Sequence, residues 1–169
     1  EEASPVHTLL GASLSADLQY SGVCPMADEG KTAALLQRLH RIGFQEVKLK
    51  LGRNLEESLT RIQMVKEIMG AETLIRADLN CAWSYKDAQK QLPYLIEAGV
   101  MNAEQIFLPE QTAAYQLITK EFGHAIRITI DEGVTTPQSA LEVMKSGIGN
   151  QLNLKVSKHG GILATLKIC

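Results

Sequence analysis

The sequence lacks several features that would assign it to a specialised class of protein. Its 169 residues carry a net charge of −2, so there is no basic excess of the kind that favours nucleic-acid binding. No apolar run approaches the roughly 20 residues that a membrane-spanning helix needs. The first residues also lack the basic and apolar regions of an export signal. We therefore expect a cytoplasmic protein without a nucleic-acid or membrane partner.

Cysteine is scarce and widely spaced. Cys24, Cys81 and Cys169 are an odd number, and no Cys-x-x-Cys pair occurs. This pattern favours reduced thiols over a disulfide framework, in keeping with a cytoplasmic setting. Apolar residues make up 45% of the chain, whose length suffices for one globular domain with a substantial core.

Short β-rich runs alternate with amphipathic helical patterns along the chain. The sequence predicts strands at residues 16–22, 46–51, 74–80, 103–108, 126–131 and 151–157. It predicts helices at residues 31–42, 55–69, 85–98, 112–122 and 137–146, and a further helix that begins at Ile162. Strict alternation of strand and helix predicts parallel βαβ units, either in an open sheet or in a (β/α)8 barrel.

The polarity of the two strand faces favours the barrel. Along residues 126–131, three isoleucines alternate with Arg127, Thr129 and Asp131. An open parallel sheet covered by helices on both faces should be apolar on both. A barrel with helices outside and a site at its mouth can be apolar outward and polar inward. We therefore predict an α/β fold of the parallel (β/α)8 TIM-barrel type, of which about six β/α units are present.

Acidic and basic side chains recur on the polar face at the strand ends. Three predicted strands end in or near an acid, at Asp78, Glu104 and Asp131. Each acid alone would be expected to be a solvated strand end or a helix cap. Charges rarely point into a barrel core unless they pair or bind a metal, however, and lysines on neighbouring strands flank these three. Together they predict a divalent-metal site with bases beside it, at the strand ends where such barrels place catalysis.

The chain resembles the enolase superfamily, and within it the muconate-lactonizing-enzyme subgroup with its dipeptide epimerases, N-acylamino acid racemases and o-succinylbenzoate synthases. Order and spacing agree along essentially the whole chain. The matching motifs are Lys48-Leu49-Lys50, Asp78-Leu79-Asn80, Glu104-Gln105, Asp131-Glu132 and Asn153-Leu154-Lys155-Val156-Ser157-Lys158-His159-Gly160-Gly161. One departure is Ile106, which follows the Glu-Gln pair where the family usually has proline.

The resemblance implies a resident divalent cation, Mg²⁺ or Mn²⁺, bound by Asp78, Glu104 and Asp131. An all-oxygen ligand set suits a hard cation that keeps some water ligands for the substrate to displace. The implied reaction is abstraction of a proton α to a carboxylate, which gives an enediolate that the metal stabilises. The implied partner is a small carboxylate-containing substrate.

The resemblance also implies roles for the lysines. Lys50 and Lys155 would be the acid/base residues on opposite faces of the substrate, and Lys48 would hold the substrate carboxylate and stabilise developing negative charge. Asn80 and Lys158 are assigned to substrate binding, with Lys158 behind the reacting groups. Two facing lysines permit epimerisation or racemisation, whereas one acting alone supports cycloisomerisation or elimination. Within these outcomes we favour a dipeptide or N-acylamino acid epimerase.

Family members open with an α+β capping domain that reads the substrate. By this resemblance, residues 1–15 are expected to be the tail of that capping domain and a linker, and residues 16–169 a partial barrel without strands seven and eight. One alternative stays open, namely a non-catalytic fragment of such an enzyme that is inactive alone and associates through its open strand edges. We expect a homo-oligomer.

Overall fold

The computed structural model describes residues 4–11 and 18–169, and its core is one curved parallel sheet. Within these residues the sheet has six strands, which lie side by side in the order in which they occur along the chain. They are β1 (Ser21–Cys24), β2 (Glu46–Lys50), β3 (Leu74–Asp78), β4 (Val100–Glu104), β5 (Arg127–Ile130) and β6 (Gln151–Leu152). The predicted alternation of parallel strands and helices is confirmed.

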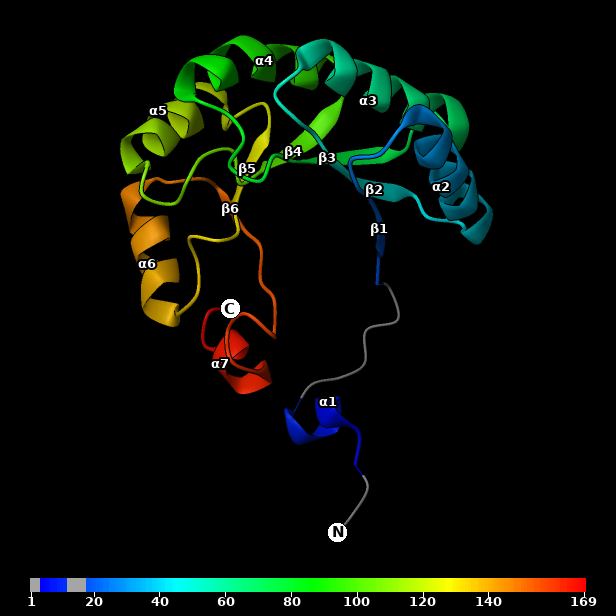
Figure 1. The fold of residues 1–169 in the computed structure, drawn as a ribbon. Helices are drawn as coiled ribbons and strands as arrows, with labels where there is room; N and C mark the ends of the chain where they lie inside the picture. Colours follow the sequence, from blue (N-terminus) through cyan, green and yellow to red (C-terminus); the bar gives the residue numbers. More distant parts are fainter. Residues whose placement is uncertain (1–3, 12–17) are drawn as a thin grey trace.

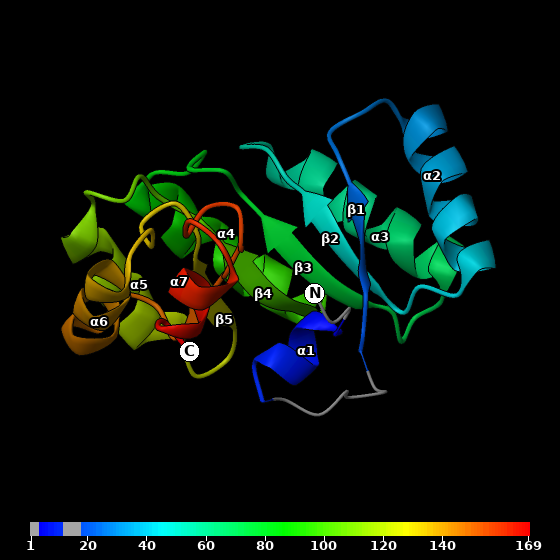
Figure 2. The ribbon, with the colours of Figure 1, turned by 90° about the horizontal axis from the view of Figure 1, so that it is seen from below.

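Five helices of ten or more residues connect successive strands. They are α2 (Glu29–Ile42), α3 (Leu55–Met69), α4 (Tyr85–Glu97), α5 (Thr112–Phe122) and α6 (Pro137–Ser146). They follow the convex side of the sheet in Figure 1. Two short helices, α1 (Val6–Leu9) and α7 (Ile162–Leu166), lie on the opposite, open side, and Figure 2 shows them from that side. Within the described residues, no helix has the length and apolarity needed to cross a membrane.

The helix-facing side of the sheet is apolar. Val47 and Leu49 of β2, and Ile128 and Ile130 of β5, are at most 1% exposed. Burying such side chains against the helices supplies most of the free energy that holds the layers together. Because side chains alternate along a strand, the residues between them face the concave side, where the polar groups gather. The predicted division into an apolar outer and a polar inner face is therefore confirmed.

Local sequence explains where several helices begin and end. Asp28 caps α2 by accepting a hydrogen bond from the backbone N–H of Lys31, at 2.9 Å. Ser84 and Asp87 form a reciprocal capping box at the start of α4. Helix α6 begins with Pro137 and ends at Ser146, and Gly147 caps its end with a left-handed φ of 69°.

Three predicted strands are wrong in extent. Strand β4 ends at Glu104, whereas residues 103–108 were predicted, because the buried loop residues Ile106 and Phe107 mimic a strand. Strand β6 ends at Leu152, whereas residues 151–157 were predicted, so Lys155 lies in a loop. Strand β1 covers Ser21–Cys24 instead of residues 16–22. The predicted residues 16 and 17, and residues 1–3 and 12–15 of the predicted linker, lie outside the described residues.

Candidate active site

Three acids meet at the carboxyl end of the sheet. Asp78 and Glu104 are the last residues of β3 and β4 and are paired in register, and Asp131 directly follows β5. Glu104 is fully buried, and Asp78 and Asp131 are each 4% exposed. Buried carboxylates at this density require compensating positive charge.

The β2 lysines supply part of that charge. Lys48 Nζ lies 3.1 Å from Asp78 Oδ2 and 2.7 Å from Glu104 Oε1, so it bridges the two acids. Lys50, which is opposite Asp78 in register, approaches Asp78 Oδ2 at 3.3 Å and donates to the side-chain oxygen of Asn80. Burial acts to lower the pKa of Lys48, but its hydrogen bonds and charge interactions with Glu104 and Asp78 outweigh burial and raise it. Lys48 is therefore a charged bridge.

A second lysine pair surrounds Asp131. Lys158 Nζ donates to Asp131 Oδ1 at 2.7 Å and to the Asp131 backbone oxygen at 2.6 Å, and Lys155 donates to Asp131 Oδ2. Burial alone would raise the pKa of Asp131, but the hydrogen bonds from Lys155 and Lys158 outweigh burial and lower it. Asp131 is therefore held as a carboxylate.

Asn153 joins the two groups of charges, a role that the sequence interpretation did not assign to it. Its side-chain amide donates to Glu104 Oε1 at 2.7 Å, and its backbone oxygen accepts from Lys158 Nζ at 3.1 Å. All eight residues singled out from the sequence thus lie in one network of contacts. The available signal for Asn153 was its position two residues before Lys155, within the same motif.

Arg76, two residues before Asp78 on the concave face of β3, contacts Glu104 from further inside the sheet. Arg76 of β3 lies 3.4 Å from Glu46 Oε1 and 3.5 Å from Glu104 Oε2. The contact with Glu104 Oε2 lacks hydrogen-bond geometry, so this buried oxygen has no hydrogen-bond partner among the described residues. Glu104 therefore keeps one acceptor oxygen that is not used in protein hydrogen bonding.

The acids are separated by lysines. In residues 4–11 and 18–169, no three His, Cys, Asp or Glu side chains lie close enough together to form a cation site as they stand. Asp78 and Glu104 share the ammonium group of Lys48, and Asp131 has Lys155 and Lys158. The three predicted metal ligands are neighbours on the sheet, and each is in an ion pair.

Trp83 and the cysteines lie outside this chemistry. Trp83 is 3% exposed and donates its indole N–H to the backbone oxygen of Gly52 at 2.8 Å, so it is a core residue that ties two loops together. All three cysteines are free thiols. Burial raises the pKa of the Cys24 and Cys81 thiols, which disfavours the nucleophilic thiolate.

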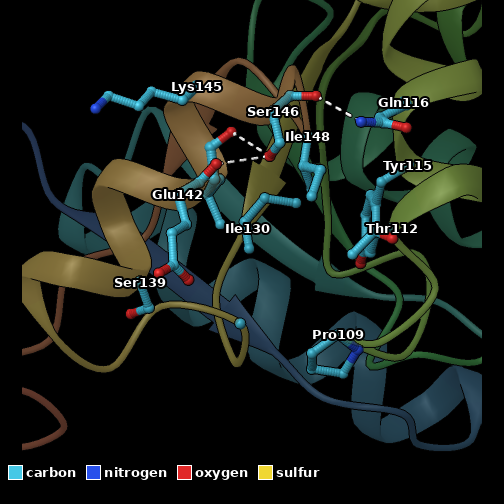
Figure 3. A pocket seen from close by; sticks show the side chains of 12 residues that line it. Pro109, Thr112, Tyr115, Gln116, Ile130, Ser139, Glu142, Lys145, Ser146 and Ile148 are labelled. Carbon is cyan, nitrogen blue, oxygen red and sulfur yellow. Dashed lines mark hydrogen bonds between the residues drawn. The ribbon is translucent and has the colours of Figure 1, made fainter.

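A groove of about 620 Å³ lies on the helix side of the sheet, between α5 and α6 (Figure 3). Ile130, Tyr115 and Ile148 contribute to its apolar lining, and Gln116 bridges its rim by donating to the backbone oxygen of Ser146 at 2.8 Å. None of the site residues singled out from the sequence lines this groove. Ile130 faces it because Ile130 points to the opposite side of β5 from Thr129.

Comparison with known proteins decides the family. The family described as Enolase C-terminal domain-like matches residues 31–169. The chain belongs to this family. Its membership in the enolase superfamily confirms the resemblance drawn from the strand-end motifs, and the parallel fold is that of the superfamily's TIM barrel.

Relatives within the superfamily are isomerases. The chain is 31% identical over 128 residues to a hydrophobic dipeptide epimerase of Enterococcus faecalis. The matched region covers 76% of this chain and 36% of that protein. It is 28% identical over 167 residues to an N-succinyl-L-Arg/Lys racemase of Bacillus cereus, which covers 97% of this chain and 44% of that protein. The chain thus spans less than half the length of these relatives.

A solved structure gives the same picture for the fold. The dipeptide epimerase of Cytophaga hutchinsonii, crystallised with Mg and the dipeptide D-Ala-L-Val, superposes with a TM-score of 0.86 at 26% identity. The superposition covers 97% of this chain and 44% of that protein. The six strands described here therefore correspond to part of an enolase-superfamily barrel.

Proposed function

We propose that this site removes and returns a proton α to the carboxylate of a small substrate, as an epimerase or racemase of dipeptides or N-acylamino acids. The observation that carries the proposal is the continuous network of three buried acids and four lysines at the strand ends. Packing alone does not explain such a concentration of buried charge. The named activities of the relatives support this chemistry for the chain.

Exposure divides the four lysines into two kinds. The side chains of Lys48 and Lys158 are 16% and 18% exposed. The side chains of Lys50 and Lys155 are 35% and 45% exposed. The amines of Lys50 and Lys155 therefore belong to the two more solvent-accessible lysines of the network. We therefore assign proton transfer to Lys50 and Lys155.

Asp78, Glu104 and Asp131 would hold Mg²⁺. Their donor set fits a hard cation because all the ligand atoms are carboxylate oxygens. Glu104 Oε2 is buried without a hydrogen bond, and the Arg76 guanidinium lies 3.5 Å from it. When bound, the cation supplies positive charge that stabilises the negative charge developing on the substrate carboxylate. A relative whose structure contains Mg together with a dipeptide supports the same choice of metal.

The lysines complete the proton balance. One neutral amine, at Lys50 or Lys155, takes the α-proton while the C–H bond electrons remain on the substrate. The ammonium group of the other lysine returns a proton to the same carbon from the opposite face, which inverts the centre. Lys48 would hold the substrate carboxylate. Asn80 would contribute to substrate binding beside Lys50, and Lys158 would hold the Asp131 carboxylate in place.

The remainder of the active site is expected from outside the described sheet. We propose that a capping domain and further barrel strands complete the substrate pocket, with residues 1–15 as the linker to the cap. The second candidate is a chain that is inactive alone and associates with further copies. Tyr20 and Val23, at or beside edge strand β1, are 70% and 53% exposed and favour such an association. Sedimentation velocity distinguishes a monomer from a homo-oligomer.

Deuterium exchange tests the proposed reaction. In D₂O with millimolar Mg²⁺, proton NMR should show loss of the α-proton signal from hydrophobic dipeptides or N-succinyl amino acids. We expect Lys50→Met to abolish exchange from one stereoisomer and Lys155→Met to abolish exchange from the other. Lys31→Met, at a lysine that is 80% exposed on α2, is the matched control and should exchange like the native protein. Undiminished exchange in both Lys50→Met and Lys155→Met would refute the assignment.

A further inference from the structure

Gln105 has an unusual backbone conformation next to a proposed metal ligand. It directly follows Glu104, is fully buried and has a φ of 46°. Few residues other than glycine adopt this left-handed region, and such residues persist where the surrounding contacts determine their conformation. The hydrogen bonds of Gln105 should therefore explain why its backbone adopts this conformation.

The side-chain amide of Gln105 connects two loops at the mouth of the sheet. Its oxygen accepts hydrogen bonds from the backbone N–H of Asp131 at 2.8 Å and of Glu132 at 3.0 Å. Its nitrogen donates to the backbone oxygen of Phe107 at 2.9 Å. Phe107 is in turn fixed by Tyr115, whose hydroxyl donates to the same oxygen at 2.7 Å and accepts from the Phe107 N–H at 3.0 Å.

The backbone of Gln105 extends the connection to the neighbouring strands. Its N–H donates to Thr129 O in β5 at 2.9 Å, and its own oxygen accepts from the N–H of Cys81, after β3, at 2.8 Å. Gln105 therefore contacts the segments that follow β3, β4 and β5, the three strands at whose ends Asp78, Glu104 and Asp131 lie.

Asp131 depends on this arrangement because the β5 ladder ends at Ile130. The N–H groups of Asp131 and Glu132 lie beyond the sheet, and the Gln105 oxygen is the acceptor for both. A buried N–H without an acceptor is strongly disfavoured, so loss of this oxygen should release the local backbone. Methionine at position 105 has no amide oxygen to accept these hydrogen bonds. Glycine at position 105 would keep the backbone conformation but would also lack the acceptor.

We propose that Gln105 is a positioning residue that fixes the backbone at Asp131 and thereby sets its carboxylate relative to Glu104. The consequence for cation binding rests on the proposed function. The two hydrogen bonds that the Asp131 and Glu132 N–H groups donate to the Gln105 oxygen form a backbone clamp. Because Lys155 and Lys158 both bind the Asp131 carboxylate, this clamp also determines where the amine of Lys155 lies. The backbone clamp itself can be tested in the metal-free protein.

Amide hydrogen exchange and Mn²⁺ binding test the proposal together. In metal-free Gln105→Met, we expect the Asp131 and Glu132 amides to exchange at least about tenfold faster than in the native protein. We expect the dissociation constant for Mn²⁺, measured by electron paramagnetic resonance, to rise roughly 10- to 100-fold. Gln91→Met is the matched control, because Gln91 is also buried and donates its amide to Arg53 O at 3.0 Å. It should leave both quantities unchanged.

Gln105→Gly separates the side chain from the backbone conformation. Glycine accepts the left-handed φ without strain, so a role confined to backbone shape predicts native exchange and native Mn²⁺ affinity for this variant. The positioning role predicts that it behaves like Gln105→Met. Native-like protection at Asp131 and Glu132 in Gln105→Gly would therefore overturn the proposal, whatever Gln105→Met shows.

Faster exchange with unchanged Mn²⁺ affinity would also overturn the proposal, because the carboxylate would then not depend on the clamp. If the native protein itself binds no Mn²⁺, the proposed metal role fails. In that case the amide exchange rates of Asp131 and Glu132 alone test whether Gln105 fixes the backbone at Asp131.

Discussion

Lys48 and Glu104 form an ion pair of 2.7 Å that reaches from β2 to β4 across the intervening strand β3. The side chain of Glu104 is 1% exposed and that of Lys48 is 16% exposed. Because Lys48 also contacts Asp78 at 3.1 Å, one ammonium group compensates two of the three strand-end acids. Lys48 is therefore the electrostatic support that Asp78 and Glu104 share.

Lys48→Met should destabilise the metal-free protein by on the order of 3 kcal/mol, because it leaves two buried carboxylates with less compensating charge. The free energy of unfolding from urea titration measures this effect. Lys31→Met removes an exposed ion pair with Asp28 and should cost less than about 1 kcal/mol. Equal losses in the two variants would contradict the supporting role of Lys48.

The stabilisation by Lys48 should disappear in alkali. Its pKa in the folded protein is raised above the ordinary value of 10.5 by Glu104 and Asp78, against the effect of burial. A raised folded pKa gives a contribution that is complete below the unfolded pKa and is lost as pH rises through the folded one. The difference in unfolding free energy between native protein and Lys48→Met should therefore be constant below pH about 10 and narrow as the pH rises above about 10.5. A constant difference would show that the pKa of Lys48 is the same in both states.

Two glycines after α6 offer a matched test of the packing around β5. Gly147 and Gly149 have similar φ values of 69° and 72°, but a Cβ at Gly147 meets nothing within 4 Å. A Cβ at Gly149 would lie 2.8 Å from both Ile128 O and Ile130 Cγ1. Gly147→Ala should cost about 1 kcal/mol from backbone strain, and Gly149→Ala roughly 1–3 kcal/mol more. Similar thermal midpoints for the two variants would show that β5 yields to the added methyl group.

Much of the fold could be predicted because its signals are local. Helix α6 was predicted with its observed bounds, since Pro137 and Gly147 mark its ends. The strand bounds were harder. Ile106 and Phe107 are fully buried, yet they lie in a loop after the left-handed Gln105. A run of apolar residues indicates burial, and it does not distinguish a strand from a packed loop.

The site could be predicted only in part for a similar reason. Period-two alternation places Lys48, Lys50 and Asp78 on one face, and the structure has them in contact. The bridge from Asn153 to Glu104 and the clamp from Gln105 to Asp131 join residues far apart in the sequence. Such bonds between a side chain and a distant partner have no periodic signal, so they emerge only from the folded chain.

The proposed function depends most on whether Asp78, Glu104 and Asp131 act together as one cation site. Thermal unfolding with and without Mg²⁺ measures this, beside Asp78→Asn and the control Asp28→Asn at the exposed cap of α2. At Mg²⁺ about 100-fold above its dissociation constant, we expect the midpoint to rise by roughly 5–10 °C in native protein and control. The rise should be lost in Asp78→Asn. No Mg²⁺-dependent rise in the native protein, or an equal rise in Asp78→Asn, would show that the three acids do not form one cation site.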